Sequence, residues 1–257
     1  MLVYLKSCYK PFTFKPKKDL LVVLISWILV TGSLSIANYI MTPQRGGLYF
    51  IFYAVVGAFI FGVGLPAYWI LIQKKESLEK LGIAKKNLAI SLILQVLLAV
   101  VLYANQTDIL FSQNFIKILP LIALALTIGF FEAFFWRGWV ITRLEDSFGT
   151  IPALLMGCIL YSAYHIGYGM NFDEMVFLFF IGLMFGILFI LTRNIFVLWP
   201  LFQPFGQLIT ITKDNSLDLP FLAVVGFLEV LVGMIALLFI FNKIAKRKSK
   251  NKSYGTT

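Results

Sequence analysis

Few side chains in this sequence could take part in acid–base chemistry from within its long apolar runs. They are Glu132, Arg137, His165, Gln203, Gln207 and Glu229. A carboxylate, an imidazole and two amides are what water-activated acyl chemistry needs: a general base, an orienting or proton-donating group, and donors for a developing oxyanion. Each residue alone could equally be a hydrogen-bonding contact between membrane helices. As a set they point to a functional site, because ionisable groups are costly in lipid.

The single histidine bears on the question of a metal. A zinc site needs three or four nitrogen, sulfur or oxygen ligands, and the apolar runs offer only His165, Glu132 and Glu229 as strong ones. Cys8 and Cys158 lie in unlike settings, which suggests neither a disulfide nor a cysteine-based metal site. We therefore expect chemistry without a metal or another cofactor.

The composition indicates a membrane protein. The 257 residues are 60% hydrophobic and 13% charged, with a mean hydropathy of +0.89. Soluble domains are closer to about half apolar and about a quarter charged, and a soluble fold could not bury this much apolar surface. We expect an all-α, polytopic bundle of about eight transmembrane helices, since runs of about 20 apolar residues can cross a bilayer.

The eight expected spans have ends that are uncertain by a few residues. They are Leu20–Met41, Leu48–Ile72, Leu88–Ala104, Phe115–Trp136, Ile151–Gly167, Met175–Thr192, Ile195–Ile211 and Leu219–Phe241. The fourth is expected to continue as a helix to about Glu145, because nothing after it breaks a helix. With these bounds, Glu132 and His165 would differ in depth by about 10 Å at 1.5 Å per residue.

The basic residues predict the orientation of the bundle. All but Arg45, Lys117 and Lys213 of the 22 Lys and Arg residues fall on one predicted side, which the positive-inside rule makes the cytoplasmic one. Both termini are then cytoplasmic: a basic segment at 1–19, a single transmembrane domain at 20–242 and a basic tail at 243–257. The net charge of +10 therefore indicates the orientation of the protein in the membrane. We expect the basic residues to contact lipid headgroups and no nucleic acid. The competing interpretation of the start is a cleaved signal peptide.

Three motifs resemble those of one family. Glu132-Ala-Phe-Phe-Trp-Arg137-Gly138 resembles a Glu-Glu-x-x-x-Arg-Gly signature, and Tyr161-Ser-Ala-Tyr-His165 resembles a Phe-x-x-x-His motif. Gln203-Pro-Phe-Gly-Gln207 occupies the region that usually reads His-x-x-x-Asn or His-x-x-x-Asp. The family is that of the CPBP intramembrane proteases, the CAAX-protease and bacteriocin-processing group also called Abi. The resemblance covers a core of about 115–211.

The resemblance implies a bundle of about eight helices with a site that is sunk in the membrane and open to the cytoplasm. It also implies roles: Glu132 activates water, His165 assists it, and Gln203 and Gln207 stand where the oxyanion-stabilising pair usually lies. The family pattern is broken at Ala133, which replaces the second Glu and removes the carboxylate that Arg137 would face. Gln203 can donate a hydrogen bond and carries no proton at neutral pH. One alternative register places Phe202 at the missing histidine.

Glu229 matches none of the motifs. It lies well inside the last span, and two roles are open for it. Glu229 either replaces the missing carboxylate and supports Arg137 as an ion-pair partner, or hydrogen-bonds within the bundle as a protonated acid.

Two functions follow from these motifs. The first is an intramembrane endopeptidase that uses Glu-activated water on a small peptide or a membrane-tethered substrate. The second is a catalytically impaired CPBP-fold protein that acts in bacteriocin immunity, in regulation or as a scaffold for a membrane-protein partner. For either function, the short chain resembles bacterial members, which places it in a bacterial plasma membrane. A transporter finds little support, since no mirrored halves or pair of broken helices is evident.

Overall fold

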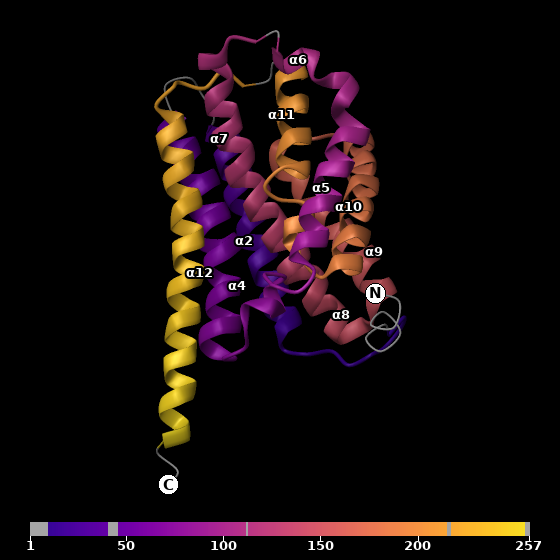
Figure 1. Cartoon of the computed structure of the whole chain (residues 1–257), viewed down its shortest axis with the longest axis vertical. Coiled ribbons are helices and arrows are strands. Elements are labelled where there is room, and N and C mark those ends of the chain that lie inside the picture. Colours follow the sequence, from indigo (N-terminus) through magenta and orange to yellow (C-terminus); the bar gives the residue numbers. More distant parts are fainter. Residues whose placement is uncertain (1–9, 41–45, 112, 215–216, 255–257) are drawn as a thin grey trace.

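The computed structural model describes residues 10–40, 46–111, 113–214 and 217–254, and within these ranges it is helical without strands (Figure 1). Cys8, Lys6 and Arg45, together with the start of the basic segment, lie outside the described residues. The expected all-α, polytopic helical bundle is confirmed. Seven helices in the described part of the chain are long and apolar enough to cross a membrane.

The elements run in this order. They are α2 (Asp19–Ile40), α3 (Gly46–Phe50), η2 (Ile51–Gly64), α4 (Leu65–Ala67), η3 (Tyr68–Gln73), η4 (Leu78–Leu81), α5 (Leu88–Tyr103), η5 (Ala104–Gln106), α6 (Asp108–Phe111), α7 (Phe115–Glu132), η6 (Ala133–Ile141), α8 (Thr142–Phe148), α9 (Thr150–Tyr164), η7 (His165–Tyr168), α10 (Phe172–Thr192), η8 (Ile195–Val197), α11 (Phe202–Asp214) and α12 (Ala223–Tyr254). The stretches η2, η3 and η6 are π-helical, and the other η elements are 3₁₀ turns.

The seventh expected span, Ile195–Ile211, is not one helix. A 3₁₀ turn, η8, is followed by α11, a helix of 13 residues. Pro200 explains the break, because proline lacks an amide hydrogen and disfavours a helical residue before it. Asn194 fixes the turn: its side chain donates to the carbonyls of Ala84 and Lys86 and accepts from the amide of Phe196. The chain still rises through the bundle here, in two pieces (Figure 1).

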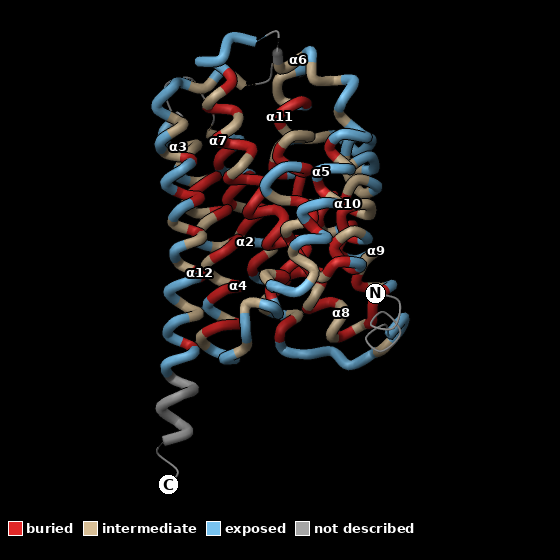
Figure 2. Tube along the Cα trace, in the orientation of Figure 1, coloured by how far each residue is buried: buried red, intermediate tan, exposed pale blue. Residues whose placement is uncertain are grey.

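The central helix of the bundle is the continuous run of α7, η6 and α8. It extends from Phe115 to Phe148, 34 residues, and is the most deeply buried of the seven spans (Figure 2). Its length exceeds what one bilayer core requires, about 20 residues. Trp136, Arg137, Trp139 and Arg143 on this helix are among the largest fully buried side chains. The expectation that the fourth span continues to about Glu145 is confirmed, with three further residues.

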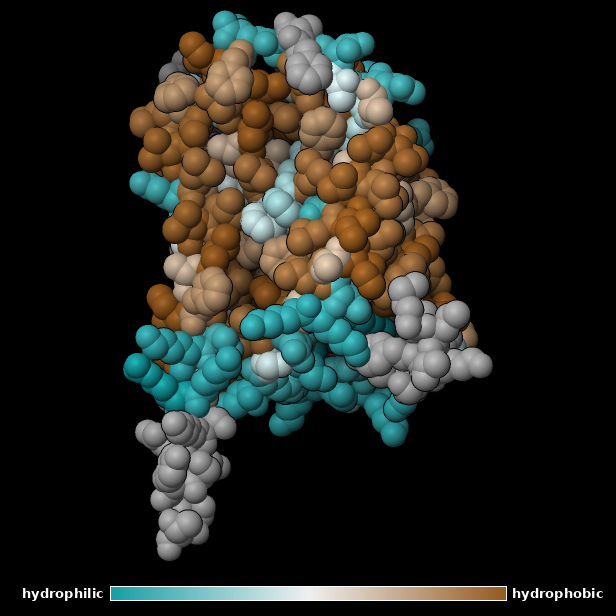
Figure 3. All heavy atoms as spheres, in the orientation of Figure 1, coloured by the Kyte–Doolittle hydropathy of each residue, from teal (hydrophilic) through white to brown (hydrophobic). Residues whose placement is uncertain are grey.

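Polar residues gather at one end of the bundle, the lower end in Figure 3, which we call the basal end. There the buried Arg143 lies 3.5–3.6 Å from carboxylate oxygens of Asp19, Glu76 and Asp146. Lys74 adds an ion pair of 2.6 Å with Asp19. These contacts join the start of α2 and the segment after η3 to α8. They fix the end of the central helix against its neighbours.

Gly138 is essential to the packing of the central helix at the basal end. A Cβ atom at this position would lie 2.2 Å from the carbonyl oxygen of Leu81 in η4. We predict that Gly138→Ala lowers the free energy of unfolding by about 1–3 kcal/mol, the usual cost of overpacking a core. The measurement is thermal unfolding in detergent micelles.

Gly32→Ala is the matched control, because a Cβ at Gly32 in α2 meets nothing within 4 Å. Alanine is favoured over glycine in a helix by about 1 kcal/mol, so this variant should be neutral or more stable. Equal destabilisation by both substitutions would contradict the proposed close contact with Leu81.

Candidate active site

Glu132 and the motif around His165 lie at the same depth in the bundle. The central helix ends at a tight turn at Gly149, which has a φ of +86°. Glu132 lies 17 residues before this turn, and Tyr164 and His165 lie 15 and 16 residues after it. Because helices rise 1.5 Å per residue, equal distances from the turn give equal depths. The expected gap of about 10 Å is wrong, since it measured depth from the ends of the expected spans, whereas α8 and α9 are joined directly at Gly149.

The carboxylate of Glu132 is the centre of the site and accepts three hydrogen bonds. The hydroxyl of Tyr164 donates to Oε1 at 2.5 Å. The side-chain amides of Gln203 and Gln207 donate to Oε2 at 2.5 and 3.0 Å. Glu132 is only 3% exposed. Donors from α9 and α11 therefore surround a buried carboxylate on α7, as an acceptor-only group requires.

The structure distinguishes the two registers of the third motif. Gln203 contacts Glu132 directly, whereas the ring of Phe202 packs against Tyr103 and Phe185 with centroid distances of 5.8 and 5.6 Å. The side-chain Oε1 of Gln95 accepts from the backbone amide of Leu201 and so fixes the chain just before α11. The sequence could not decide this register, because it depends on where the helix begins after the break.

Two small contacts bring α11 up to α7. A Cβ atom on Gly129 would lie 2.7 Å from the ring of Pro204 and 3.5 Å from Oε1 of Gln207. Gly129 lies one turn before Glu132 on α7, so its lack of a side chain allows both amides to approach the carboxylate. Pro204 lies in the first turn of α11, where proline costs no helix hydrogen bond.

His165 lies beside the site without a hydrogen bond to Glu132 among those found in the described residues. Its Nδ1 contacts the carbonyl oxygen of Tyr161 at 2.8 Å. The carbonyl can only accept, so Nδ1 carries the hydrogen and Nε2 is the acceptor in the neutral ring. The imidazole lies 4.2 Å from the ring of Tyr164, centroid to centroid, and also contacts Tyr168. Tyr164 therefore stands between His165 and the carboxylate.

Tyr164 was not among the residues that the sequence predicted for the site. The signal was present, because a hydroxyl in an apolar run next to the lone histidine is a polar group that needs a partner in lipid. It was overlooked because the family motif directs attention to the histidine one position later. The described structure makes Tyr164 the only direct partner of Glu132 that α9 provides.

The expected pairing of Glu229 with Arg137 is wrong. Glu229 is exposed on α12, and no ion pair joins the two among those of the described residues. Arg137 is buried inside the bundle with its guanidinium 4.5 Å from the ring centroid of Tyr161 and 5.0 Å from that of Phe185. Such cation–π contacts stabilise a buried guanidinium. Within the described ranges, Glu229 forms neither an ion pair with Arg137 nor a side-chain hydrogen bond to another helix.

Several buried polar atoms around Glu132 make no hydrogen bond within the described part of the chain. They are Oε1 of Gln203 and Oε1 of Gln207, and the same central helix adds Nε1 of Trp136 and Nε and Nη1 of Arg137. Buried polar atoms normally have partners, so an unpaired group calls for an explanation. Acceptors of this kind next to a carboxylate suit the binding of water or of a peptide group. Gln207, which is half-buried, is the most accessible of the three partners of Glu132.

The side chains around Glu132 provide few ligands for a metal ion. In the described ranges, no group of three His, Cys, Asp or Glu side chains is placed to hold one. Around Glu132 the neighbours are amides and a phenol, which are poor zinc ligands.

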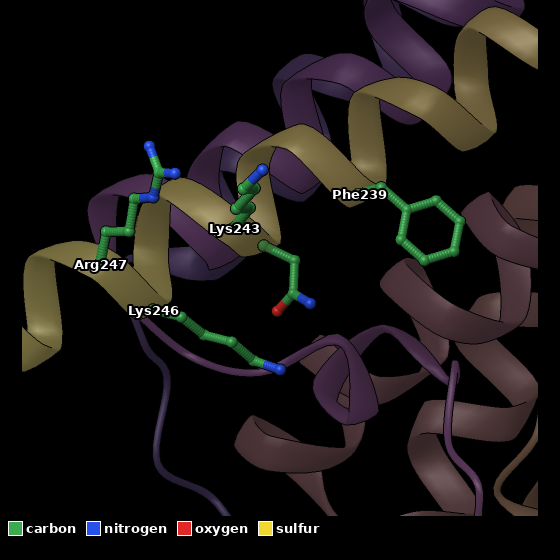
Figure 4. Close-up of a pocket in the computed structure, with 5 residues that line it drawn as sticks. Phe239, Lys243, Lys246 and Arg247 are labelled. Carbon is green, nitrogen blue, oxygen red and sulfur yellow. The ribbon is translucent and has the colours of Figure 1, made fainter.

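A separate cavity of about 440 Å³ lies at the basal end, lined by Phe239, Asn242, Lys243, Lys246 and Arg247 of α12 (Figure 4). Arg247 extends to one side of the helix and Lys246 to the other. These cations do not converge on one point, and none belongs to the elements that surround Glu132. The cavity is therefore distinct from the carboxylate site.

A family model described as type II CAAX prenyl endopeptidase Rce1-like matches residues 113–201. The resemblance to the CPBP family is thereby confirmed over this segment. The match includes Glu132, Arg137 and His165 and ends before Gln203 and Gln207. It supports a CAAX protease-type intramembrane enzyme in general. Comparisons with curated proteins and with solved structures gave no match.

The contact between Gln203 and Glu132 can be tested through stability. Gln203→Met keeps the length of the side chain and removes the donor to Oε2, so we predict a loss of about 1–3 kcal/mol in the free energy of unfolding. Gln207→Met should cost less, because its bond is longer and the residue is half-buried. Thermal unfolding of both variants in the same detergent gives the comparison.

A double-mutant cycle with Glu132→Gln supplies the control, since residues in contact show non-additive effects. Additive losses for Gln203→Met and Glu132→Gln would show that the two side chains do not interact.

Proposed function

We propose that this protein is an intramembrane endopeptidase in which Glu132 acts as the general base. The observation that supports this most strongly is the buried carboxylate, which three donors from two other helices hold in place. A site that is fixed before substrate binds requires no reorganisation during the reaction. The match to a CAAX prenyl endopeptidase family over the segment that contains Glu132 supports the same class of reaction.

The proposed reaction is hydrolysis of a peptide bond. Glu132 takes a proton from water while the water oxygen bonds to the scissile carbonyl carbon, and the carbonyl oxygen becomes an oxyanion. The carbonyl then re-forms as the carbon–nitrogen bond breaks, and the proton on Glu132 passes to the departing amine. A carboxyl and an amine result, so atoms and charges balance.

The two glutamines are proposed as the oxyanion donors. Each side-chain amide has two N–H bonds, and one of them points to Glu132 in both Gln203 and Gln207. The second N–H of each remains for the substrate oxygen. Removal of one such donor typically reduces kcat by about 10²–10³-fold in hydrolases.

The proposed substrate is a small peptide or a membrane-tethered precursor. Glu132 lies deep inside a bundle of apolar spans, so a substrate anchored in the same bilayer would reach it with little loss of apolar contact. The family description names a prenyl endopeptidase, and a prenylated peptide is therefore the first probe to use.

A second candidate is a catalytically impaired protein of the same fold that serves bacteriocin immunity, regulation or the binding of a membrane-protein partner. One observation favours it: a glutamine stands at position 203, and the carboxylate already accepts three hydrogen bonds. Under this proposal Glu132 is a structural centre that ties α7, α9 and α11 together.

We predict that Glu132→Gln lowers kcat by about 10²–10⁴-fold, the usual contribution of a general base. The assay follows cleavage of a prenylated fluorogenic CAAX peptide by protein in proteoliposomes. Glu229→Gln is the matched control, because the same change on the exposed face of α12 should leave the rate unaltered.

Equal rates for wild type and Glu132→Gln would contradict the role of Glu132. An inactive wild type that still confers an immunity phenotype, unaltered by Glu132→Ala, would establish the second candidate instead.

The proposed chemistry uses no metal, so chelation should leave peptide cleavage unchanged. Treatment of the proteoliposomes with EDTA and 1,10-phenanthroline, followed by elemental analysis of the purified protein, tests this. One tightly held zinc per chain, with loss of activity on its removal, would contradict the prediction.

A further inference from the structure

Tyr164 is the direct partner of Glu132 on the helix that carries the family's histidine motif. We infer that Tyr164 is the positioning residue of the reaction proposed above, on which this inference rests: it directs one oxygen of Glu132 to the attacking water. The three hydrogen bonds to Glu132 are distributed unequally over its two carboxylate oxygens.

Each carboxylate oxygen can accept two hydrogen bonds in the plane of the group. Oε2 accepts from both Gln203 and Gln207, so its two positions are filled. Among the hydrogen bonds of the described residues, Oε1 accepts only that of Tyr164 and therefore keeps one position. The remaining position on Oε1 is where the carboxylate can accept a proton from water. Tyr164 thus occupies one position on Oε1 and leaves the second as the place where Glu132 accepts the proton of water.

A chain of hydroxyl groups extends behind Tyr164. The hydroxyl of Tyr168 lies 3.5 Å from that of Tyr164, and the hydroxyl of Tyr53 on η2 lies 2.7 Å from that of Tyr168. Because Tyr164 donates to an ionised Glu132, its oxygen is left as an acceptor for Tyr168, whose oxygen is in turn an acceptor for Tyr53. All three O–H dipoles then point toward the carboxylate. Hydrogen bonds in such a chain polarise one another, and the contact of Tyr168 with Tyr164, at 3.5 Å, is the longer and weaker of the two links.

His165 supports the ring of Tyr164. Its Nδ1 is held by the carbonyl of Tyr161, and its ring lies against that of Tyr164 with an interplanar angle of 62°. Trp136 on the central helix packs against the same tyrosine, with a centroid distance of 4.9 Å. Two neighbours therefore fix the ring, and the hydroxyl has little freedom to leave Oε1.

This arrangement gives Tyr164 a function that Gln203 lacks. A phenol adjusts the strength of its hydrogen bond as the charge on the carboxylate changes, through a polarisable O–H in a connected chain. When Glu132 accepts the proton of water on the second position of Oε1, the bond from Tyr164 keeps that oxygen in place for return of the proton to the departing amine. The phenolic proton stays on Tyr164 throughout.

The test is Tyr164→Phe, which removes one oxygen atom and keeps the ring. With the prenylated fluorogenic peptide in proteoliposomes, we expect kcat to fall by about 10²-fold while KM changes by less than about 3-fold. Tyr49→Phe is the matched control: Tyr49 contacts the ring of Tyr53 at 5.5 Å and lies outside the hydroxyl chain. It should keep the wild-type rate.

A second readout separates positioning from a merely structural role. In protein labelled with ¹³C-glutamate, the infrared spectrum of wild type minus Glu132→Gln isolates the carboxylate stretch of Glu132. Tyr164→Phe should shift this band, and Tyr49→Phe should leave it unchanged. In the Glu132→Gln background, Tyr164→Phe should cause no further loss of kcat, because it acts through the carboxylate.

The outcomes are distinguishable. A wild type that does not cleave the peptide contradicts the proposed function and, with it, any positioning role. An active wild type with an equally active Tyr164→Phe variant overturns the inference alone, and so does an unshifted carboxylate band. A fall in kcat that Tyr49→Phe reproduces would assign the loss to packing and would also overturn it.

Discussion

The structure depends on one constraint: a carboxylate that lies inside a membrane bundle must be surrounded by hydrogen-bond donors. Burial of an unpaired charge costs far more than a folded domain can tolerate. Glu132 meets this requirement with a phenol from α9 and two amides from α11. The helices that supply these donors have to approach α7 closely, so the needs of a single side chain determine how three elements pack.

The packing around Glu132 follows from this requirement. Gly129 allows α11 to approach, and the break before α11 allows its first turn to begin at the depth of the carboxylate. The ion pairs of Arg143 at the basal end hold the far end of the same helix. Arg143 is buried among three carboxylates from different segments, a network in which loss of one partner would leave a buried charge uncompensated. The central helix is thus fixed at the site and at its end.

The sequence predicted the helical class, most span boundaries and the residues that meet at the site, because apolar length and misplaced polar groups are local signals. Glu132, Gln203 and Gln207 do come together. The register of α11 depends on tertiary contacts that no local signal carries. The break at Pro200 and the match in depth between Glu132 and His165 had local signals, a proline and the turn at Gly149, that the expected spans did not include. Tyr164 was overlooked although its hydroxyl in an apolar run was a visible signal, whereas Glu229 was misjudged because its orientation depends on tertiary packing. Which face of a helix points inward depends on neighbours whose positions the sequence does not specify.

Access to the carboxylate is the remaining problem that this packing creates. Tyr164 and Gln203 are buried, whereas Gln207 is half-buried and is the most exposed of the three partners of Glu132. Gln207 also makes the longest of the three bonds to the carboxylate. The partner with the longest bond is therefore also the most exposed one, and its departure would leave a free position on Oε2. In the proposed endopeptidase, this asymmetry would let the buried partners Tyr164 and Gln203 hold the carboxylate while Gln207 moves to admit a peptide.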